Sequence, residues 1–289
     1  MYNPLARYYE EIFPVSENQI QFVLSTIYHR NSGHRQGGEA SPPQPPLRLL
    51  DVGCAVGDLA AGVVQSGTGR EIEVDAIDLN SAMIQQAEAR HSRALQAGGL
   101  RFHQMDMLKI GHEFQAEHFN AVACLGNTLV HLPGPVEIAH FLHSSARILR
   151  ARPNIDGDRQ AGDAEGTVGG RGCLILQQLN YDYLLEERPK KLPLIETEQV
   201  RFEREYSYTT GSGIGSGDIR VLFTTRLHIN ETGEVHEDSV ELYPLRRREL
   251  KSLLKSAGFG QPEFYGSFDG SPLKADSFPL IAVADLQTW

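Results

Sequence analysis

Residues 49–57 read LLDVGCAVG, an apolar strand that runs directly into a turn with glycines at positions 53 and 57. A second apolar run, residues 72–78, also reads as a buried strand, and it ends in the carboxylate of Asp78. In a doubly wound α/β sheet, the turn after the first strand lets a nucleotide approach the backbone, and an acid ending the second strand binds the ribose. The two features together predict an adenosine-containing cofactor.

The spacing of the glycines distinguishes two classes of cofactor. A dinucleotide fold uses G-x-G-x-x-G, so that the pyrophosphate rests on backbone amides at a helix N-terminus. Here position 55 is alanine, and Asp51 places a carboxylate at the mouth of the turn. A carboxylate repels a diphosphate and attracts a cation. The pattern therefore favours S-adenosylmethionine, which has a sulfonium and an ammonium group but no phosphate, over NAD.

Several motifs resemble those of class I S-adenosylmethionine-dependent methyltransferases. The first strand and its turn resemble motif I of this family, and Asp78, in the sequence IDLN, resembles the acid that holds the ribose hydroxyls. Residues 104–107 (QMDM) are similar to the motif that reads the adenine edge, and residues 124–132 (CLGNTLVHL) to the fourth-strand motif of the glycine N-methyltransferase-like branch. Similarity at residues 2–10 and 180–185 extends the resemblance over nearly the whole chain.

The resemblance implies a set of residues around S-adenosylmethionine and its product S-adenosylhomocysteine. Asp51 would engage the methionine ammonium, Asp78 the ribose and Asp106 the adenine. The other implied cofactor-binding residues are Tyr9, Gly53, Cys54, Ala55, Gly57, Leu79, Met83, Met107, Leu125, Gly126 and His131. Methyl transfer needs an acceptor held in line with the sulfonium rather than a covalent residue. No catalytic residue is therefore identified, and the candidates for positioning the acceptor are Asn127, His131 and Tyr181.

Three of these residues also have a purely structural interpretation. Asn127 either binds substrate or fixes its loop, His131 either contacts the cofactor or begins a helix, and Tyr9 either covers the cofactor or packs in the core. His140 and His143 have ligand-like spacing on a predicted helix, but no third ligand is evident in the sequence. We therefore expect no metal site.

Leu179 departs from the glycine N-methyltransferase pattern, which has an arginine there to hold the substrate carboxylate. Free glycine is therefore not the expected acceptor. Arg201, Arg220 and Arg226 are candidate replacements for that cation. We expect a small-molecule acceptor that is methylated at an amine nitrogen. Small-molecule O-methylation and a non-catalytic S-adenosylmethionine-binding regulatory role are the alternatives.

Strand and helix patterns alternate along the first half of the chain, which predicts a doubly wound, mostly parallel seven-stranded sheet. Antiparallel strands that follow the fifth strand predict a lid. The expected strands are 47–52, 72–78, 100–104, 119–125, 173–179, 196–209, 218–230, 234–243, 261–268 and 278–285, and the expected helices are 57–66, 81–97, 135–149 and 246–257. One or two further helices are expected within residues 5–30, ahead of the sheet.

These elements divide the chain into five predicted segments. They are an N-terminal helical cap (1–30), a flexible Pro-rich linker (31–46), a cofactor-binding α/β core (47–185, with a disordered insertion at 151–171), an antiparallel β lid (186–243), and a C-terminal helix and strands that complete the core (244–289). The lid would form the substrate subdomain.

Composition limits the partners of the protein. The 289 residues carry a net charge of −10, and no Lys/Arg cluster is interleaved with aromatic residues, so we expect no nucleic-acid partner. No apolar stretch approaches a membrane span and no signal peptide is evident, so we expect no membrane contact and a cytoplasmic location. The three cysteines are expected to be reduced and packed. A small-molecule substrate and a possible homo-oligomer remain as partners.

Overall fold

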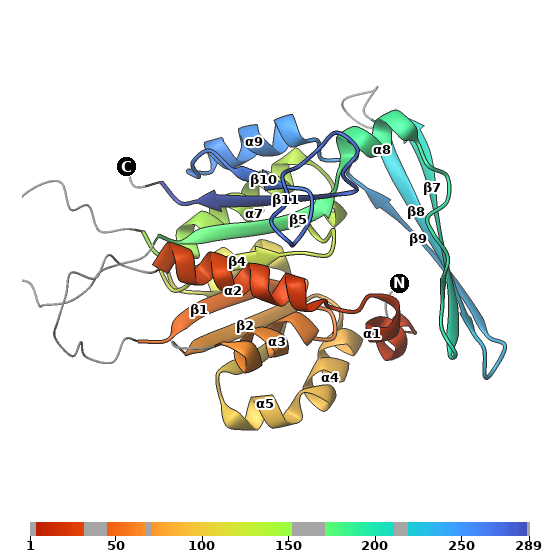
Figure 1. Ribbon diagram of the computed structural model, residues 1–289, viewed down its shortest axis with the longest axis horizontal. Helices are drawn as coiled ribbons and strands as arrows, with labels where there is room; N and C mark the ends of the chain where they lie inside the picture. The colour runs from red at the N-terminus through yellow and green to blue at the C-terminus, as the bar shows by residue number, and fades with distance from the viewer. Residues whose placement is uncertain (1–3, 32–44, 68–70, 152–170, 211–218, 288–289) are drawn as a thin grey trace, which may run out of the picture.

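The computed structural model describes residues 4–31, 45–67, 71–151, 171–210 and 219–287 (Figure 1). The predicted linker at 31–46 and the predicted insertion at 151–171 lie almost entirely outside these residues. The five-segment division of the chain stays a prediction.

The central sheet of the described chain has seven strands in the order β10-β11-β5-β4-β1-β2-β3. Neighbouring strands are parallel except where β11 pairs with β5 and with β10. The predicted mostly parallel, seven-stranded sheet is therefore confirmed. Its strands are β1 (Leu47–Val52), β2 (Ile72–Asp78), β3 (Leu100–Gln104), β4 (Ala121–Cys124), β5 (Cys173–Leu179), β10 (Glu263–Tyr265) and β11 (Pro279–Asp285).

Helices cover both faces of this sheet (Figure 1). The helices α2 (Glu17–Asn31) and α3 (Asp58–Ser66) pack their apolar residues on one face, and α7 (Pro135–Ile148) and α9 (Arg247–Ser256) pack theirs on the other. Successive residues of a strand point to opposite faces. Leu49 and Leu50 of β1 are accordingly both fully buried, one in each layer. Burial on both sides explains why the strands read as continuous apolar runs.

A second, antiparallel sheet follows β5 in sequence and stands at the carboxyl ends of the parallel strands (Figure 1). We call it the lid sheet, and its strands, in spatial order, are β6 (Ile195–Glu196), β7 (Val200–Thr210), β8 (Ile219–Ile229) and β9 (Val235–Leu242). Alternate residues of β8, such as Val221 and Leu227, are buried, as the sequence alternation predicted. Leu5 and Tyr8 pack against the inner face of this sheet.

The helix predicted over 81–97 is interrupted at His91. It forms α4 (Ser81–Arg90) and α5 (Ser92–Ala97), because His91 leaves helical geometry with φ −103° and ψ 24°. Nε2 of His91 lies 3.1 Å from the Val56 carbonyl oxygen and 3.1 Å from Asp58 Oδ1, so the imidazole ties this break to the turn after β1.

Several helices are too short to show a helical pattern of apolar residues in the sequence. They are η1 (Leu5–Tyr8), α1 (Tyr9–Ile12), η2 (Met107–Lys109), α6 (Ile110–Glu113), η3 (Leu129–His131) and α8 (Tyr181–Glu187). Two of them, η1 and α1, lie within the region 5–30 where helices were expected. β4 is also shorter than the strand expected over 119–125. All three cysteines are free and buried, as expected.

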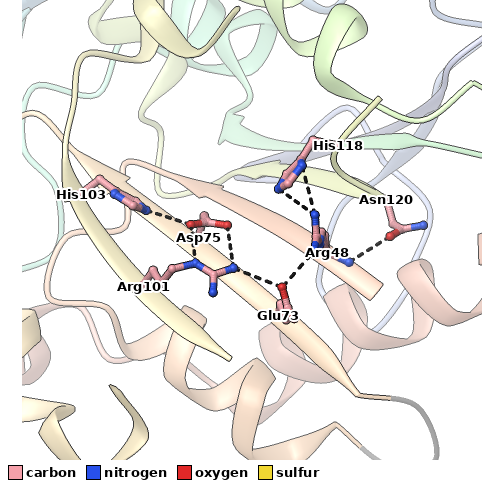
Figure 2. A network of polar contacts seen from close by, with 7 residues as sticks. All are labelled: Arg48, Glu73, Asp75, Arg101, His103, His118 and Asn120. Carbon is pink, nitrogen blue, oxygen red and sulfur yellow. Dashed lines mark hydrogen bonds and ion pairs between the residues drawn. The ribbon is translucent and has the colours of Figure 1, made fainter. Parts of the chain in front are cut away.

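A network of polar contacts lies across β1, β2 and β3 (Figure 2). At its centre, the buried carboxylate of Asp75 accepts a hydrogen bond from Arg101 Nε at 3.1 Å and lies 2.8 Å from His103 Nε2. These two partners hold the pKa of Asp75 below its usual range, against the effect of burial. The other members of the network are Arg48, Glu73, His118 and Asn120. Arg101 and His103 thus favour the anionic form of this buried strand carboxylate.

Gly57 ends the turn after β1 with φ +80°, and a Cβ at this position would lie 2.4 Å from Phe102 Cζ. We expect Gly57→Ala to lower the free energy of unfolding by about 2–4 kcal/mol, because left-handed backbone strain and steric overlap add. Gly233→Ala is the matched control, since Gly233 also has a positive φ but has no atom within 4 Å of a built Cβ. Thermal denaturation of both variants measures the difference, and equal losses would show that Phe102 moves aside freely.

Candidate active site

A cavity of about 350 Å³ lies between the carboxyl ends of the parallel strands, the N-terminal helices and the lid sheet. The parallel strands contribute the turn after β1, the loop after β4 and the end of β5, which is where ligands bind in open α/β sheets. Nine of the residues predicted for the site line this cavity. They are Tyr9, Asp51, Gly53, Cys54, Ala55, Leu125, Gly126, Asn127 and His131.

The turn after β1 brings bare backbone to the cavity. Gly53 and Ala55 have φ values of +73° and +48°, so the chain coils tightly before α3 begins. The backbone N–H groups of Gly53 and Cys54 both donate to the carbonyl of Ile77, at 2.8 and 2.9 Å. A Cβ on Gly53 would lie 2.4 Å from Thr128 Cγ2, so only glycine lets this turn contact the loop after β4. The sequence motif therefore forms a tight glycine turn, and the approach of a cofactor to its backbone stays a prediction.

Asp51 is a buried acid of the cavity, with a carboxylate oxygen left unsatisfied by the described residues. Its residue is only 2% exposed, and among the described residues its Oδ2 has no hydrogen-bond partner. Burial, and then the nearby Asp78, raise the pKa of Asp51 to about 7. Asp75, one strand away, is also buried, but Arg101 and His103 both lie within hydrogen-bond distance of its carboxylate (Figure 2). The contrast indicates that a cation from a bound ligand would stabilise the Asp51 carboxylate.

Asp78 ends β2 next to the same turn. Its carboxylate accepts hydrogen bonds from the backbone N–H of Ala55 at 3.0 Å and of Asn80 at 2.8 Å. Burial raises the pKa of Asp78, although these backbone donors act in the opposite direction. The next residue, Leu79, is 68% exposed. Its side chain offers an apolar surface beside Asp78 that a flat apolar ring could cover. Asp78 is therefore placed both to brace the turn and to accept further hydrogen bonds.

The predicted cofactor-binding residues that do not line the cavity are Gly57, Asp78, Leu79, Met83, Asp106 and Met107. Met83 is buried against Ala55 and Val56, under the turn. Asp106 follows β3 at the same carboxyl edge of the sheet, where its Oδ1 accepts a hydrogen bond from the Leu108 N–H at 2.9 Å. Met107 packs against the core on the α7 side. Contacts of these residues with a cofactor stay predictions.

Asn127 is engaged by its own fold. Its Oδ1 accepts from the Leu179 N–H at 3.0 Å, and its Nδ2 donates to Tyr181 Oη at 3.2 Å. The neighbouring Gly126 N–H donates to Gln177 Oε1 at 2.7 Å. These contacts tie the loop after β4 to β5 and favour the loop-fixing interpretation of Asn127. Tyr181 is almost fully buried and is not a lining residue of the cavity, so a direct contact with an acceptor is not expected from it.

His131 and Tyr9 line the cavity from elements that are far apart in the sequence. His131 ends η3, and burial lowers the pKa of its imidazole, which favours the neutral form. Tyr9 begins α1, and its ring centroid lies 5.2 Å from that of Phe13. The ring packs against its neighbours, as the structural interpretation requires, and it also lines the cavity. That Tyr9 covers a cofactor stays a prediction. Further aromatic lining comes from Phe202, Tyr206, Phe223 and Phe278.

Arg204 of β7 lines the cavity and was missed by the sequence analysis. The three arginines that were considered lie elsewhere, each paired with a glutamate. The pairs are Arg201–Glu203 at 2.9 Å, Arg220–Glu241 at 3.3 Å and Arg226–Glu237 at 2.6 Å. The alternation of side chains along β7 identifies Arg204. It lies on the same face of the strand as the buried residues Phe202 and Tyr206, which flank it.

Comparisons with known proteins agree with this geometry. Residues 49–152 match the model of a methyltransferase domain. Over 239 residues, the chain is 25% identical to a glycine/sarcosine N-methyltransferase from Aphanothece halophytica, a match that covers 82% of this chain and 75% of that protein.

Two solved structures share the whole fold. An S-adenosylmethionine-dependent methyltransferase from Clostridium acetobutylicum matches with TM-score 0.70 and 12% identity over 99% of both chains. An amino pentose methyltransferase from Micromonospora echinaspora, solved with S-adenosylmethionine bound, matches with TM-score 0.59 and 16% identity over 99% of this chain and 98% of that one. The fold predicted from the sequence motifs is confirmed.

Proposed function

Since the chain is a class I S-adenosylmethionine-dependent methyltransferase, we propose that it methylates a small molecule at an amine nitrogen. The observation that supports the cofactor in this proposal is the buried carboxylate of Asp51, whose Oδ2 has no hydrogen-bond partner among the described residues, in a cavity that the lid sheet helps to line. S-Adenosylmethionine supplies an electrophilic methyl group on a sulfonium, which passes to the lone pair of an acceptor as the carbon–sulfur bond breaks. The described residues fit this cofactor, because its ammonium group provides the cation that Asp51 lacks.

The remaining cofactor contacts follow from the same edge of the sheet. The turn at Gly53 would admit the amino-acid portion against bare backbone, and Asp78 would accept hydrogen bonds from the ribose hydroxyls. Leu79 would cover one side of the adenine, and Asp106 would bind its edge. Residues of α1 and of the lid sheet would exclude water above the reacting groups.

Nitrogen is the preferred acceptor atom for two reasons. The sequence relative from Aphanothece halophytica is named for methylation of the amines glycine and sarcosine. An amine must be uncharged to present its lone pair, and a partly desolvated cavity lowers an ammonium pKa in that direction. The cavity is lined by Phe202, Phe223 and Phe278 among others, and these apolar rings would displace water from a bound amine.

O-Methylation is the second candidate function, and His131 is the observation that supports it. A hydroxyl acceptor must lose its proton, and a neutral imidazole is a suitable base. His131 lines the cavity and burial lowers its pKa. The third alternative, a non-catalytic S-adenosylmethionine-binding regulator, requires binding without turnover.

Calorimetric titration of the purified protein with S-adenosylmethionine, S-adenosylhomocysteine and NAD tests the cofactor first. We expect the two sulfur compounds to bind and NAD not to bind, because Asp51 repels a diphosphate. A screen of amines and alcohols with matched carbon skeletons, read by formation of S-adenosylhomocysteine, then decides between nitrogen and oxygen. Turnover of alcohols alone would overturn the amine proposal, and binding of NAD alone would overturn the cofactor assignment.

The location, partners and oligomeric state of the protein were also predicted from the sequence. Within the described residues, no helix has both the length and the apolar content to cross a membrane. The cytoplasmic location, the absence of a nucleic-acid partner and a possible homo-oligomer stay predictions.

A further inference from the structure

Arg204 projects from the lid sheet into the cavity with only part of its guanidinium engaged. Its Nη2 donates to the Pro193 carbonyl at 2.8 Å, and its Cζ lies 5.8 Å from the centroid of the Phe13 ring. Its Nε is buried and has no hydrogen-bond partner among the described residues. A guanidinium donates through a planar fork of N–H groups, so a buried Nε without an acceptor leaves one donor of that fork unsatisfied.

The charge of Arg204 is also unbalanced. Arg201, Arg220 and Arg226 of the lid sheet each have a glutamate within 3.3 Å. No carboxylate pairs with Arg204 in the part of the chain that the structure describes, and burial lowers the pKa of its guanidinium. Burying an unpaired cation is unfavourable unless an anion accompanies it. The position therefore favours a ligand that brings its own negative charge.

We propose that Arg204 determines acceptor specificity by binding a carboxylate of the methyl acceptor, which is therefore an amine that also bears a carboxylate. This inference rests on the proposed function and names the substrate class of the same cavity. A carboxylate matches the fork of a guanidinium and can accept from two of its N–H groups together.

The rest of the cavity favours a single negative charge on the acceptor over a phosphate dianion. Arg204 is the one lysine or arginine among the lining residues that the structure describes, whereas Asp51 and Asp58 supply negative charge. His131 is held toward its neutral form. Asp51 comes from β1 of the central sheet and Arg204 from β7 of the lid sheet. The cavity therefore offers one subsite for the cofactor ammonium and a separate one for the acceptor carboxylate.

Matched pairs of primary amines test the proposal without knowledge of the natural acceptor. The pairs are glycine and glycinamide, β-alanine and β-alaninamide, and phenylalanine and phenylalaninamide. For each compound, kcat/KM is measured by formation of S-adenosylhomocysteine, and affinity by calorimetry with protein loaded with S-adenosylhomocysteine. The variants are Arg204→Met, which keeps the apolar stem over Phe13, and Arg204→Lys, which keeps the charge without the fork. Arg201→Met, on the same strand, is the matched control.

We expect the wild-type protein to prefer the carboxylate member of at least one pair. Arg204→Met should weaken that carboxylate by about 30-fold or more and leave its carboxamide within about twofold, because only the charge pair is lost. Arg204→Lys should give an intermediate value, and Arg201→Met should match wild type. A purely structural role of Arg204 would instead lower both members of a pair together.

Two results would overturn this inference. One is a wild-type protein that prefers no carboxylate, including one that neither binds nor methylates any compound of the panel. The other is a carboxylate preference that persists in Arg204→Met. If S-adenosylhomocysteine itself fails to bind the wild-type protein, the proposed function fails as well, so that the two failures are distinguishable.

Discussion

Asp78→Ala is expected to weaken binding of S-adenosylhomocysteine by about 100-fold or more. Two hydrogen bonds from ribose hydroxyls to a carboxylate contribute about 1.5–3 kcal/mol each. The substitution also removes the acceptor for the Ala55 N–H, which braces the turn after β1. Isothermal titration of the wild type and the variant measures the change directly.

Two further variants separate the roles of the carboxylate. Asp78→Asn keeps one oxygen acceptor for the turn but removes the charge, so we expect a smaller loss of affinity than in Asp78→Ala. Asp276→Ala is the control for removal of an exposed acid, since Asp276 lies on an exposed loop. Wild-type affinity in Asp78→Ala would show that the ribose binds elsewhere and would contradict the assignment of the second strand.

The central sheet was the part of this fold that the sequence determined most directly. The bounds of β1, β2 and β3 agree with the expected strands residue for residue, because each is a short apolar run between turn-forming residues. The break at His91 was not predictable, since it depends on contacts with Val56 and Asp58 that come from a distant turn. Helical periodicity within residues 81–97 carries no information about such contacts.

The candidate site was predictable where a motif is local and not where it depends on packing. Asp51 and Gly53 belong to one contiguous motif, and both line the cavity. Tyr181 follows β5 as the family pattern predicts, but its side chain is buried and contacts Asn127. Arg204 belongs to no motif, and its importance arises only when the lid sheet folds over the parallel strands. Alternation along a strand identifies its face, whereas the partner of that face is set by tertiary structure.

Asp51→Asn is expected to stabilise the free protein at pH 8 while it weakens binding of S-adenosylmethionine. The folded-state pKa of Asp51, about 7, lies above its unfolded value of 3.8. Between these values the native state binds more protons than the unfolded state, so the contribution of Asp51 to stability falls as pH rises from about 4 to about 7. Above pH 7 the cost reaches about 4 kcal/mol. An amide avoids the charge but leaves a buried polar group, for a net gain of about 2 kcal/mol.

Three measurements together test this trade between stability and binding. Melting temperatures of the free proteins should favour Asp51→Asn by a growing margin between pH 5 and pH 8. Titrations at pH 8 should show affinity for S-adenosylmethionine reduced about 30-fold or more, because the variant cannot pair with the ammonium. Titrations at pH 6.5 in buffers of different ionisation enthalpy should show proton release on binding to wild type and none with the variant. A variant that binds as tightly as wild type would place the cofactor cation away from Asp51, and a variant that melts lower at every pH would contradict the cost of the buried charge.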